Sequence, residues 1–485
     1  MPIKIDNFQL GVAQSPHTGF ADMRNVLIDE KDGIATIGWK TVSVADTSNM
    51  VNWITQDENN LTTFYAIDIS GIVYQSTNSG DSWAILSDRS GSGEGIKVWK
   101  DYVIVASNPS LEAYGPISGS ATWNNLATFA NGTNHHPMFK GQDDILYVGD
   151  ARHILSIEEV GNFSAGTAST YTINTQALDL PEDYYIKSID ESGINLMIGT
   201  RKGISSLYES QIGDIFPWDR TTDSFELPIK LQRSGINQMI SLNNLIYFNA
   251  GVEGEYFITN GSSVKLLKQI PKHIVNLVGQ KWINSNPGAI MIFNNKLYFG
   301  IMSSSSSGEE ITDGVGVWSI NLNTGAIILE NQISTGSTGG TTPNDVAIRA
   351  IAPVGKNRYL IGYTDGATYK IDKVSNTQRY TDYAARIDSQ YYSVGTKNKP
   401  ESFSQLEFEL AEPLRTGEGI RFFYRIDLRS AFTSIRTFDF ATDGAIQGGN
   451  TDFLITTEQG IQVRIEMTTG ASSTTTISLK SVIII

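Results

Sequence analysis

Short runs of apolar and aromatic residues, with a Gly or Ala near their end, return along most of the chain. Each run is followed within a few residues by a turn that carries Gly, Asn or Asp. Seven such runs occupy residues 63–67, 102–106, 145–149, 196–199, 245–249, 297–300 and 359–362. Similar units that recur roughly every 40–50 residues are typical of a β-propeller, in which each unit forms one blade. We therefore predict a seven-bladed β-propeller.

The predicted propeller covers residues 33–380. Its blades are expected at residues 50–90, 95–130, 136–180, 184–232, 236–280, 288–332 and 346–378. A strand at residues 34–42 is the candidate to close the ring, because closure removes an exposed sheet edge. Residues 1–32 lack the blade pattern and are interpreted as an ordered arm. Two tracts rich in Ser, Gly and Thr, at residues 303–310 and 334–342, have little to bury and are expected to be flexible connectors.

Beyond residue 380 the hydrophobic pattern becomes long and strictly alternating. Apolar residues alternate with Glu at residues 406–410 and with Arg at residues 420–426. The linker between these two strands is short, so we expect them to pair, with Glu and Arg facing one another on the solvent side. Further strands are predicted at residues 434–440, 453–457, 461–467 and 475–485. Six or more antiparallel strands in about 100 residues are typical of a β-sandwich.

The predicted fold class is therefore all-β. A seven-bladed β-propeller at residues 33–380 follows an N-terminal arm at residues 1–32. An antiparallel, jelly-roll-like β-sandwich at residues 381–485 completes the chain.

The sharpest local motif lies in the first predicted blade, and it consists of Ser76, Asn78, Gly80, Ser82 and Trp83. Asn78 can bond to amides of the turn, Gly80 can adopt a positive φ, and Trp83 can pack on the blade. The motif resembles the Asp-box of sialidases and related propellers, with Asn78 in place of the Asp and Ser82 in place of the Thr. In those families the box lies away from the active site, so the resemblance implies a structural turn.

Composition narrows the range of functions. The chain of 485 residues has 36 Lys and Arg against 51 Asp and Glu, which gives a net charge of −15. This balance, with no basic cluster, argues against binding to a nucleic-acid backbone. The absence of Cys excludes disulfides, thiolate nucleophiles and Cys-based zinc sites. We expect neither a signal peptide nor a membrane span, because no basic region precedes an apolar run and no apolar stretch is long enough.

Candidate catalytic and metal-binding residues are few. The five histidines are His17, His135, His136, His153 and His273. The adjacent pair at positions 135 and 136 is expected in a loop or at the surface, because no cluster of metal ligands surrounds it. Hydrolase-elbow, Walker-loop and zinc-protease motifs are missing. Residues 321–325 fit a type I turn better than a calcium loop.

Enzymatic activity is therefore not expected. The sialidase resemblance would imply an arginine triad and a Tyr–Glu pair, but the Arg-Ile-Pro signature is missing and only one box is present. We predict no catalytic, cofactor-binding or metal-binding residues. Paired carboxylates among the 51 acidic residues leave glycosidase chemistry as an open alternative.

Two segments resemble the virion proteins of tailed bacteriophages. Residues 8–26 are similar to the N-terminal arm of propeller-type virion proteins, and residues 387–389, 395–400 and 424–427 are similar to their appended sandwich. The resemblance implies a structural tail or tail-attached protein, made in the host cytoplasm and assembled with other virion proteins and with copies of itself. It also fits a chain without Cys or a signal peptide, because such parts leave the cell by lysis.

Three functions follow as hypotheses. The first is the non-enzymatic virion component, for which the propeller is a rigid scaffold and the arm and sandwich are docking surfaces. The second is a carbohydrate-binding or glycan-cleaving, sialidase-like propeller that recognises a bacterial surface, with Trp123 or Trp218 stacking on sugars. The third is a scaffold propeller of cellular origin.

Overall fold

The structure is a computed structural model of the 485-residue chain. It describes residues 2–13, 20–28, 33–89, 91–129, 135–203, 212–271, 282–304, 314–333, 346–366, 368–393, 400–470 and 474–485. Strands dominate these ranges. The helical elements described are the 3-10 turns η1 (Phe8–Leu10) and η2 (Ala168–Thr170) and the single-turn helix α1 (Phe440–Asp443).

Five consecutive antiparallel sheets of four strands each follow one another along the chain. The first two consist of β6 (Val51–Gln56), β7 (Phe64–Asp68), β8 (Ile72–Ser76) and β9 (Ala84–Asp88), then β10 (Ser92–Trp99), β11 (Tyr102–Asn108), β12 (Ser110–Gly115) and β13 (Thr122–Thr128). The third consists of β14 (Met138–Lys140), β15 (Leu146–Asp150), β16 (His153–Glu159) and β17 (Tyr171–Asp179). The last two consist of β18 (Tyr184–Ser192), β19 (Asn195–Lys202), β20 (Gly213–Trp218) and β21 (Ile229–Leu231), then β22 (Ile236–Leu242), β23 (Leu245–Ala250), β24 (Glu255–Thr259) and β25 (Val264–Gln269).

Two more units of the same form are embedded in larger sheets. One consists of β27 (Ile290–Phe293), β28 (Lys296–Gly300), β30 (Gly316–Asn321) and β31 (Ile327–Gln332). The other consists of β32 (Ala347–Val354), β33 (Arg358–Asp365), β34 (Thr368–Arg379) and β5 (Trp39–Asp46), with β26 (Trp282–Asn284) and β29 (Met302–Ser304) added beside β32. The outer strand β5 comes from the N-terminal part of the chain, so the last unit is completed by residues that precede the first.

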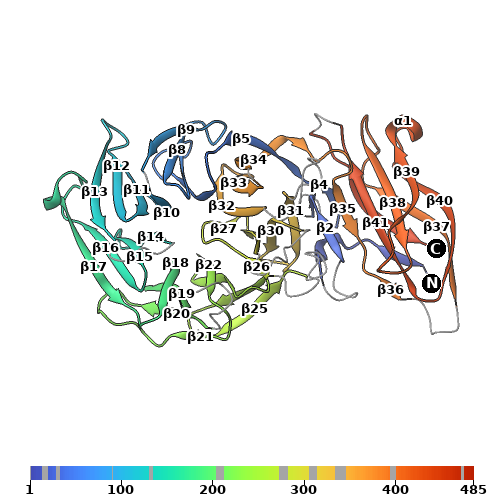
Figure 1. The fold of residues 1–485 in the computed structure, drawn as a ribbon. Helices are drawn as coiled ribbons and strands as arrows, with labels where there is room; N and C mark the ends of the chain where they lie inside the picture. Colours follow the sequence, from blue (N-terminus) through green and yellow to red (C-terminus); the bar gives the residue numbers. More distant parts are fainter. Residues whose placement is uncertain are drawn as a thin grey trace.

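These units form a β-propeller. The innermost strands β6, β10, β14, β18, β22, β27 and β32 each contact the next one, and β32 contacts β6 again. In Figure 1 the labelled inner strands surround the middle of this ring, with the C-terminal strands beside it. The ring is thus closed by contacts at its centre as well as by β5 at its rim.

The closing strand expected at residues 34–42 is divided in the structure. Its first part is β4 (Ala35–Ile37), which pairs with β42 (Ser478–Ile484) in the C-terminal unit. Its second part begins β5, which pairs with β34. Gly38 separates the two parts. A Cβ at this position would lie 2.8 Å from the carbonyl oxygen of Asn25, so only glycine fits where the chain passes the arm.

The seven apolar runs seen in the sequence are the second strands of the seven units, namely β7, β11, β15, β19, β23, β28 and β33. Each lies between two strands of its own sheet, and its side chains pack on both faces against neighbouring units, so it is buried almost throughout. Burial on both faces explains why these strands read as continuous apolar runs rather than as alternation.

The glycines at the ends of four of these runs mark close packing between units. A Cβ on Gly149, Gly199, Gly300 or Gly362 would lie 2.9, 2.8, 2.3 or 3.0 Å from a side chain of the next inner strand. The facing residues are Ile186, Ile236, Ile348 and Val51. A β-branched side chain of one unit thus packs into the space left by the missing side chain of the unit before it.

Substitution of Gly300 tests this packing. Gly300→Ala should lower the free energy of unfolding by roughly 1–3 kcal/mol, because the new methyl group overlaps Ile348 and interior packing tolerates little extra volume. Gly470→Ala is the matched control, since its Cβ would meet the nearest atom at 3.5 Å. Urea denaturation of both variants measures the effect. Equal stability of the two variants would contradict the packing argument.

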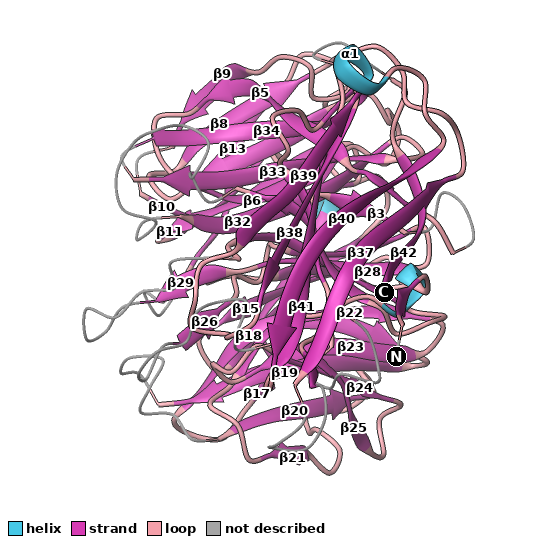
Figure 2. Ribbon diagram, turned by 90° about the vertical axis from the view of Figure 1, so that its right-hand side faces the viewer, coloured by secondary structure: helices cyan, strands magenta, loops and turns pink. Residues whose placement is uncertain are grey.

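The C-terminal unit consists of two antiparallel layers. One has the order β3 (Val26–Leu27), β4, β42, β37 (Glu401–Leu410) and β40 (Gly448–Thr457), with β1 (Ile3–Ile5) also pairing with β42. The other contains β35 (Ala385–Asp388), β41 (Gly460–Thr468), β38 (Gly419–Arg425) and β39 (Thr433–Asp439), with β36 (Tyr392–Ser393) beside β41. Figure 2 shows β37, β38, β40 and β41 crossing in front of the ring. Phe408 of the first layer packs on Phe422 and Phe438 of the second, with ring centroids 5.1 and 4.8 Å apart.

The pairing expected between the strands at residues 406–410 and 420–426 is wrong. These strands are β37 and β38, and they lie in different layers. The Glu and Arg side chains therefore have other partners: Glu409 pairs with Lys480 at 2.6 Å, and the guanidinium of Arg421 lies 3.4 Å from the ring centre of Tyr383. The linker crosses from one layer to the other because the apolar faces of both strands then point into one shared core.

The arm joins the two halves of the molecule. Strand β2 (Asp22–Arg24) pairs in parallel with β31 of the ring and antiparallel with β35 of the C-terminal unit. One sheet of ten strands therefore runs from β27 near the ring centre to β39. Strand β2 of the arm is thus an internal strand of this sheet.

Candidate functional site

The Asp-box-like turn follows β8. The side-chain oxygen of Asn78 accepts hydrogen bonds from the amide of Ser82 at 3.0 Å and from the hydroxyl of Ser76 at 2.9 Å. Gly80 has a φ of +79°, and its amide donates to the Ser76 hydroxyl at 3.0 Å. Trp83 is half-buried against the apolar core between the first and last units. All five motif residues thus meet in one self-bonded turn, which presents no group arranged for catalysis.

The two tryptophans considered for sugar stacking are not free rings. Trp218 is buried, and its indole N–H donates to the carbonyl of Thr222 at 2.6 Å. Trp123 is half-buried, with the Arg89 guanidinium 4.4 Å from its ring centre and Tyr114 5.0 Å away on the same strand pair. Neither offers an open face of the kind that stacks on a sugar.

Polar residues occupy a repeated irregularity of the inner strands. In β6, β10, β18, β22 and β32, the pairing with the second strand skips one residue. A β-bulge leaves that residue out of the ladder and re-aims its side chain. The residues at the five bulges are Asn52, Glu94, Lys187, Asn237 and Arg349. All inner strands start at the same end of the ring, so the five residues gather at that end.

Glu94 shows how the sequence builds one of these bulges. It stands between Gly93 and Gly95, where a Cβ would lie only 1.9 Å from the carbonyl oxygen of Asp68 and 2.2 Å from that of His136. The backbones of both neighbouring units therefore lie very close to β10. The Asn52 amide adds a hydrogen bond of 2.9 Å to the carbonyl of Gly93. The two glycines permit this approach, and Glu94 is held between them.

The charges of the bulge residues act on one another across the axis. Strands β10, β18 and β32 belong to units that are not neighbours, yet Glu94 lies within the electrostatic reach of Lys187 and Arg349. Burial raises the pKa of Glu94 to about 8, although these two cations oppose the shift. Burial, reinforced by Arg201, lowers the pKa of Lys187 to about 8. Burial also lowers the pKa of Arg349. The cluster therefore combines at least two cations with a carboxyl that is largely protonated at neutral pH.

His135 and His136 were expected in a loop or at the surface, and they lie in a loop that faces the interior. His136 is fully buried, stacks on Phe129 with ring centroids 3.7 Å apart, and its Nδ1 lies 2.8 Å from the carbonyl oxygen of Gly149. Burial lowers its pKa to about 4. His135 lies 3.7 Å from Glu94, and burial followed by Lys187 and Arg349 lowers its pKa well below the usual value. The loop alternative fits the structure, and the burial of His136 in that loop was not foreseen from the sequence.

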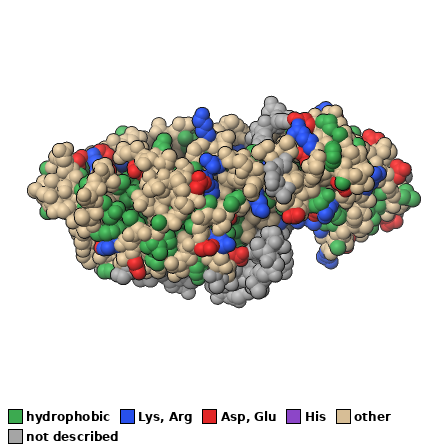
Figure 3. Space-filling model, turned by 90° about the horizontal axis from the view of Figure 1, so that it is seen from above, with side chains coloured by type: hydrophobic (Ala, Val, Ile, Leu, Met, Phe, Trp, Pro, Cys, Tyr) green, Lys and Arg blue, Asp and Glu red, His purple; other side chains and the backbone are tan. Residues whose placement is uncertain are grey.

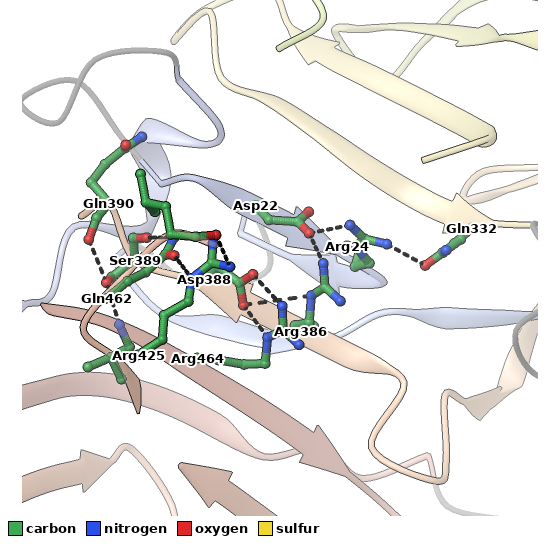
Figure 4. Close-up of polar contacts among 12 residues, drawn as sticks. Asp22, Arg24, Gln332, Arg386, Asp388, Ser389, Gln390, Arg425, Gln462 and Arg464 are labelled. Atoms are coloured by element: carbon green, nitrogen blue, oxygen red, sulfur yellow. Dashed lines mark hydrogen bonds and ion pairs between the residues drawn. The ribbon is translucent and has the colours of Figure 1, made fainter. Parts of the chain in front are cut away.

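A second polar cluster, the junction network, lies where β2 meets β31 and β35 (Figure 4). The Asp22 carboxylate accepts hydrogen bonds from both Arg24 and Arg386. Arg24 also donates to the side-chain oxygen of Gln332 at 3.3 Å. Asp388 is held by two hydrogen bonds of 2.8 Å from Arg464. Burial raises the pKa of Asp22, but the two arginines outweigh it and lower the pKa to about 2.

The junction network continues into the C-terminal unit. The Gln462 amide donates to the carbonyl of Ser389 at 2.7 Å and its oxygen accepts from Arg425 at 2.6 Å. Gln390 donates to the carbonyl of Ala13 at 2.8 Å. Arm, ring and C-terminal unit are thus linked by side chains as well as by backbone pairing.

Neither this cluster nor the axis cluster was found from the sequence. Aligning the blades by their inner strands would have shown the bulge position as a recurrent polar residue after Val, Ile or Gly.

Metal-binding and membrane-crossing features were also sought. Within the described ranges, no group of three or more His, Asp or Glu side chains is arranged to hold a metal ion. No helix in the part of the chain that the structure describes is both long and apolar enough to span a bilayer. On the face drawn in Figure 3, basic and acidic side chains are interspersed rather than gathered into one field.

Some segments that carried sequence predictions lie outside the described residues. They are residues 14–19 of the arm, which include His17, residues 272–281 with His273, most of the tract at 303–310, the tract at 334–342, and residues 394–399.

No protein-family model matches this sequence, and no curated protein matches it either. Solved structures give remote likenesses. The chain is similar to the β-propeller domain of Myceliophteria thermophila Cps50 (Swd1), with 10% identity and a TM-score of 0.46 over 68% of this chain and 98% of that one. It is similar to YCF48 bound to D1 peptide, with 7% identity and a TM-score of 0.46 over 70% and 96%. It is also similar to Chaetomium thermophilum Raptor, with 9% identity and a TM-score of 0.45 over 70% of this chain and 30% of that one. The assignment to the β-propellers rests on the sheet topology.

Proposed function

We propose that the protein is a non-enzymatic structural component of a bacteriophage particle, in the tail or attached to it. Its seven-bladed propeller, at residues 33–380, is the rigid scaffold. The N-terminal arm, at residues 1–32, and a jelly-roll-like β-sandwich, at residues 381–485, dock on other virion proteins and on copies of this chain. Nucleic acid and membrane are not among its partners, and the chain is made in the host cytoplasm.

The observation that carries the proposal is the built-in arm. Strand β2 completes the sheet between ring and C-terminal unit. The Asp22–Arg386 ion pair links the arm to the C-terminal unit, and the hydrogen bond from Arg24 to Gln332 links the arm to the ring. Linked in this way, the arm, the ring and the C-terminal unit share one continuous sheet. A shared sheet of this kind suits a particle component, and the Asp-box-like turn presents no catalytic group.

Mass spectrometry of purified particles tests the proposal. Particles from a lysate of the source culture, banded on a density gradient, should contain peptides of this chain in a constant ratio to the tail proteins. An abundant host enzyme, measured in the same fractions, is the control for trapped cytosol. Absence of the chain from mature particles, or a ratio that follows the host enzyme, would remove the proposal.

The alternative is a carbohydrate-binding or glycan-cleaving propeller that recognises a bacterial surface. Trp218 is buried and Trp123 is stacked against Arg89, so neither of these two rings supports it. A glycan array, read for both binding and hydrolysis, separates the two hypotheses. Saturable binding to surface polysaccharides would favour the alternative.

A further inference from the structure

The last unit of the ring is built from two separate stretches of chain. Strands β32, β33 and β34 come from residues 347–379, whereas their outer neighbour β5 comes from residues 39–46. The chain runs from β5 directly into β6, so the backbone joins β5 to the first unit. Strands β32–β34 are held to β5 and to the first unit by non-covalent contacts. We call this boundary the seam of the ring.

The backbone pairing across the seam is irregular. The register of β34 on β5 shifts after Ile371, and after Val374 the pairing resumes only at Arg379. Every residue of β5 is exposed or half-buried. An interrupted ladder on a solvent-exposed strand opens more readily than a regular ladder inside a sheet. Contacts other than backbone pairing are therefore needed to keep the seam closed.

The Asp-box-like turn of the first unit supplies such contacts. A Cβ on Gly80 would lie 2.6 Å from Cδ2 of Leu360 on β33, so the Leu360 side chain packs directly on the backbone of the turn. The carboxylate of Asp81, the next residue, lies 2.6 Å from Nζ of Lys373 on β34. Trp83 packs into the apolar core that the first and last units share. The turn thus reaches past β5 to both strands on the far side of the seam.

The ion pair of the turn is unequal in burial. The side chain of Lys373 is 4% exposed, whereas that of Asp81 is 62% exposed. Among the described residues, Asp81 is the one acidic side chain within salt-bridge distance of Lys373. A buried cation that loses its partner is strongly destabilising, because water cannot take the partner's place. The contact of Asp81 is therefore worth far more than an ion pair between two exposed groups.

We infer that the Asp-box-like turn is the clasp of the ring. It holds β33 and β34 against the first unit through Leu360 and the Asp81–Lys373 ion pair, and without it the ring opens between β34 and β5. Every other unit of the ring is one continuous stretch of chain, so a single motif is sufficient. This inference does not depend on the proposed place of the chain in a virion.

Hydrogen exchange of the full chain, followed by mass spectrometry, tests the clasp. Peptides from β34 and β5 report opening of the seam, and peptides from β15 report a distant unit. Asp81→Asn should speed exchange in β34 and β5 about tenfold or more and leave β15 within twofold. Asp46→Asn is the matched control, because it removes an exposed carboxylate 3.9 Å from Lys370 in the same strand pair. It should leave all these peptides within twofold of the parent.

Two further variants separate a clasp from a turn with a local role. Lys373→Met, added to Asp81→Asn, removes the unpaired buried cation and should restore most of the lost protection. Asn78→Ala breaks hydrogen bonds within the turn and should speed exchange in β34 and β5 as well as in β8 and β9. Equal exchange at the seam in Asp81→Asn and Asp46→Asn would overturn the inference. An effect of Asn78→Ala confined to β8 and β9 would do the same.

Discussion

Asp22→Ala should lower the free energy of unfolding by roughly 3–5 kcal/mol, because it leaves Arg24 and Arg386 charged at the junction without their shared carboxylate. Both guanidinium groups are largely buried, so water cannot take the place of the lost partner. The change also removes the side-chain link between β2 and β35. We therefore expect the ring and the C-terminal unit to unfold in separate transitions in the variant, where the parent chain shows one.

Urea denaturation followed by tryptophan fluorescence and by far-UV circular dichroism measures both effects. Asp6→Ala is the matched control, because it breaks an exposed ion pair of 2.7 Å with Lys4 and should cost less than about 1 kcal/mol. A loss at Asp22 no larger than that at Asp6 would contradict the role assigned to the junction network.

The junction also has a pH signature. The pKa of Asp22 is depressed in the folded chain to about 2 from an ordinary 3.8. The ion pairs of Asp22 therefore contribute their full stabilisation above about pH 4. This stabilisation is lost as the pH falls from about 4 to about 2. The free energy of unfolding of the parent chain should fall more steeply with pH in this interval. Asp22→Asn should remove this extra slope.

Glu94→Gln should raise stability in mild alkali and change the pH profile of the whole chain. Burial raises the folded pKa of Glu94 to about 8, whereas the unfolded carboxyl titrates near 4.5. Between these values the folded state holds a proton that the unfolded state has lost, so stability falls as the pH rises, by about 1.4 kcal/mol per unit. The amide of Gln imitates the protonated acid and cannot ionise. The variant should match the parent at pH 5 and exceed it at pH 8.

The difference in slope between Glu94→Gln and the parent from pH 6 to pH 8 isolates this effect, because the buried His135 and His136, whose pKa values are lowered, contribute to the slope of both chains. Asp190, whose pKa is raised by burial to about 6, titrates mostly below this interval, and Lys187, whose pKa is lowered by burial to about 8, titrates mostly above it. Chemical denaturation at several pH values gives the slope. Glu158→Gln, at an exposed position on β16, should keep the parental slope. A Glu94→Gln chain with the parental slope would show that Glu94 is ionised in the folded protein at neutral pH.

The second strand of each propeller unit was the most predictable element. Residues 145–149 and 297–300, for example, lie inside a sheet and between neighbouring units, so every position is apolar or small. Such a strand can be recognised without knowing its partners. The inner strands cannot be recognised in this way, because their side chains include charged groups. In a linear sequence Lys187 looks like an ordinary surface lysine.

The second limit on prediction from the sequence was the pairing of strands that lie far apart in the chain. Strand β2 is only three residues long and reads as a fragment of an arm, yet it bonds to strands whose residues are hundreds of positions away. The Arg386–Asp22 contact spans 364 positions. Local patterns do not encode which sheet a strand enters, and the same limit explains why β37 and β38 were wrongly expected to pair. The burial of His136 within its loop could not be foreseen for the same reason, since it depends on contacts with Phe129 and Gly149.

The internal position of β2 has a consequence for the order of folding. The arm is synthesised before the ring, but β35 and β41 are synthesised after it, and β2 stays without a complete sheet until then. Pairings of such sequence separation are slow to form, since a long loop must close before any contact compensates for it. The ring blades, built from neighbouring strands, can assemble during synthesis. A nascent chain should therefore carry a formed propeller with a protease-sensitive arm, which becomes protected only when residues 385–468 have been released.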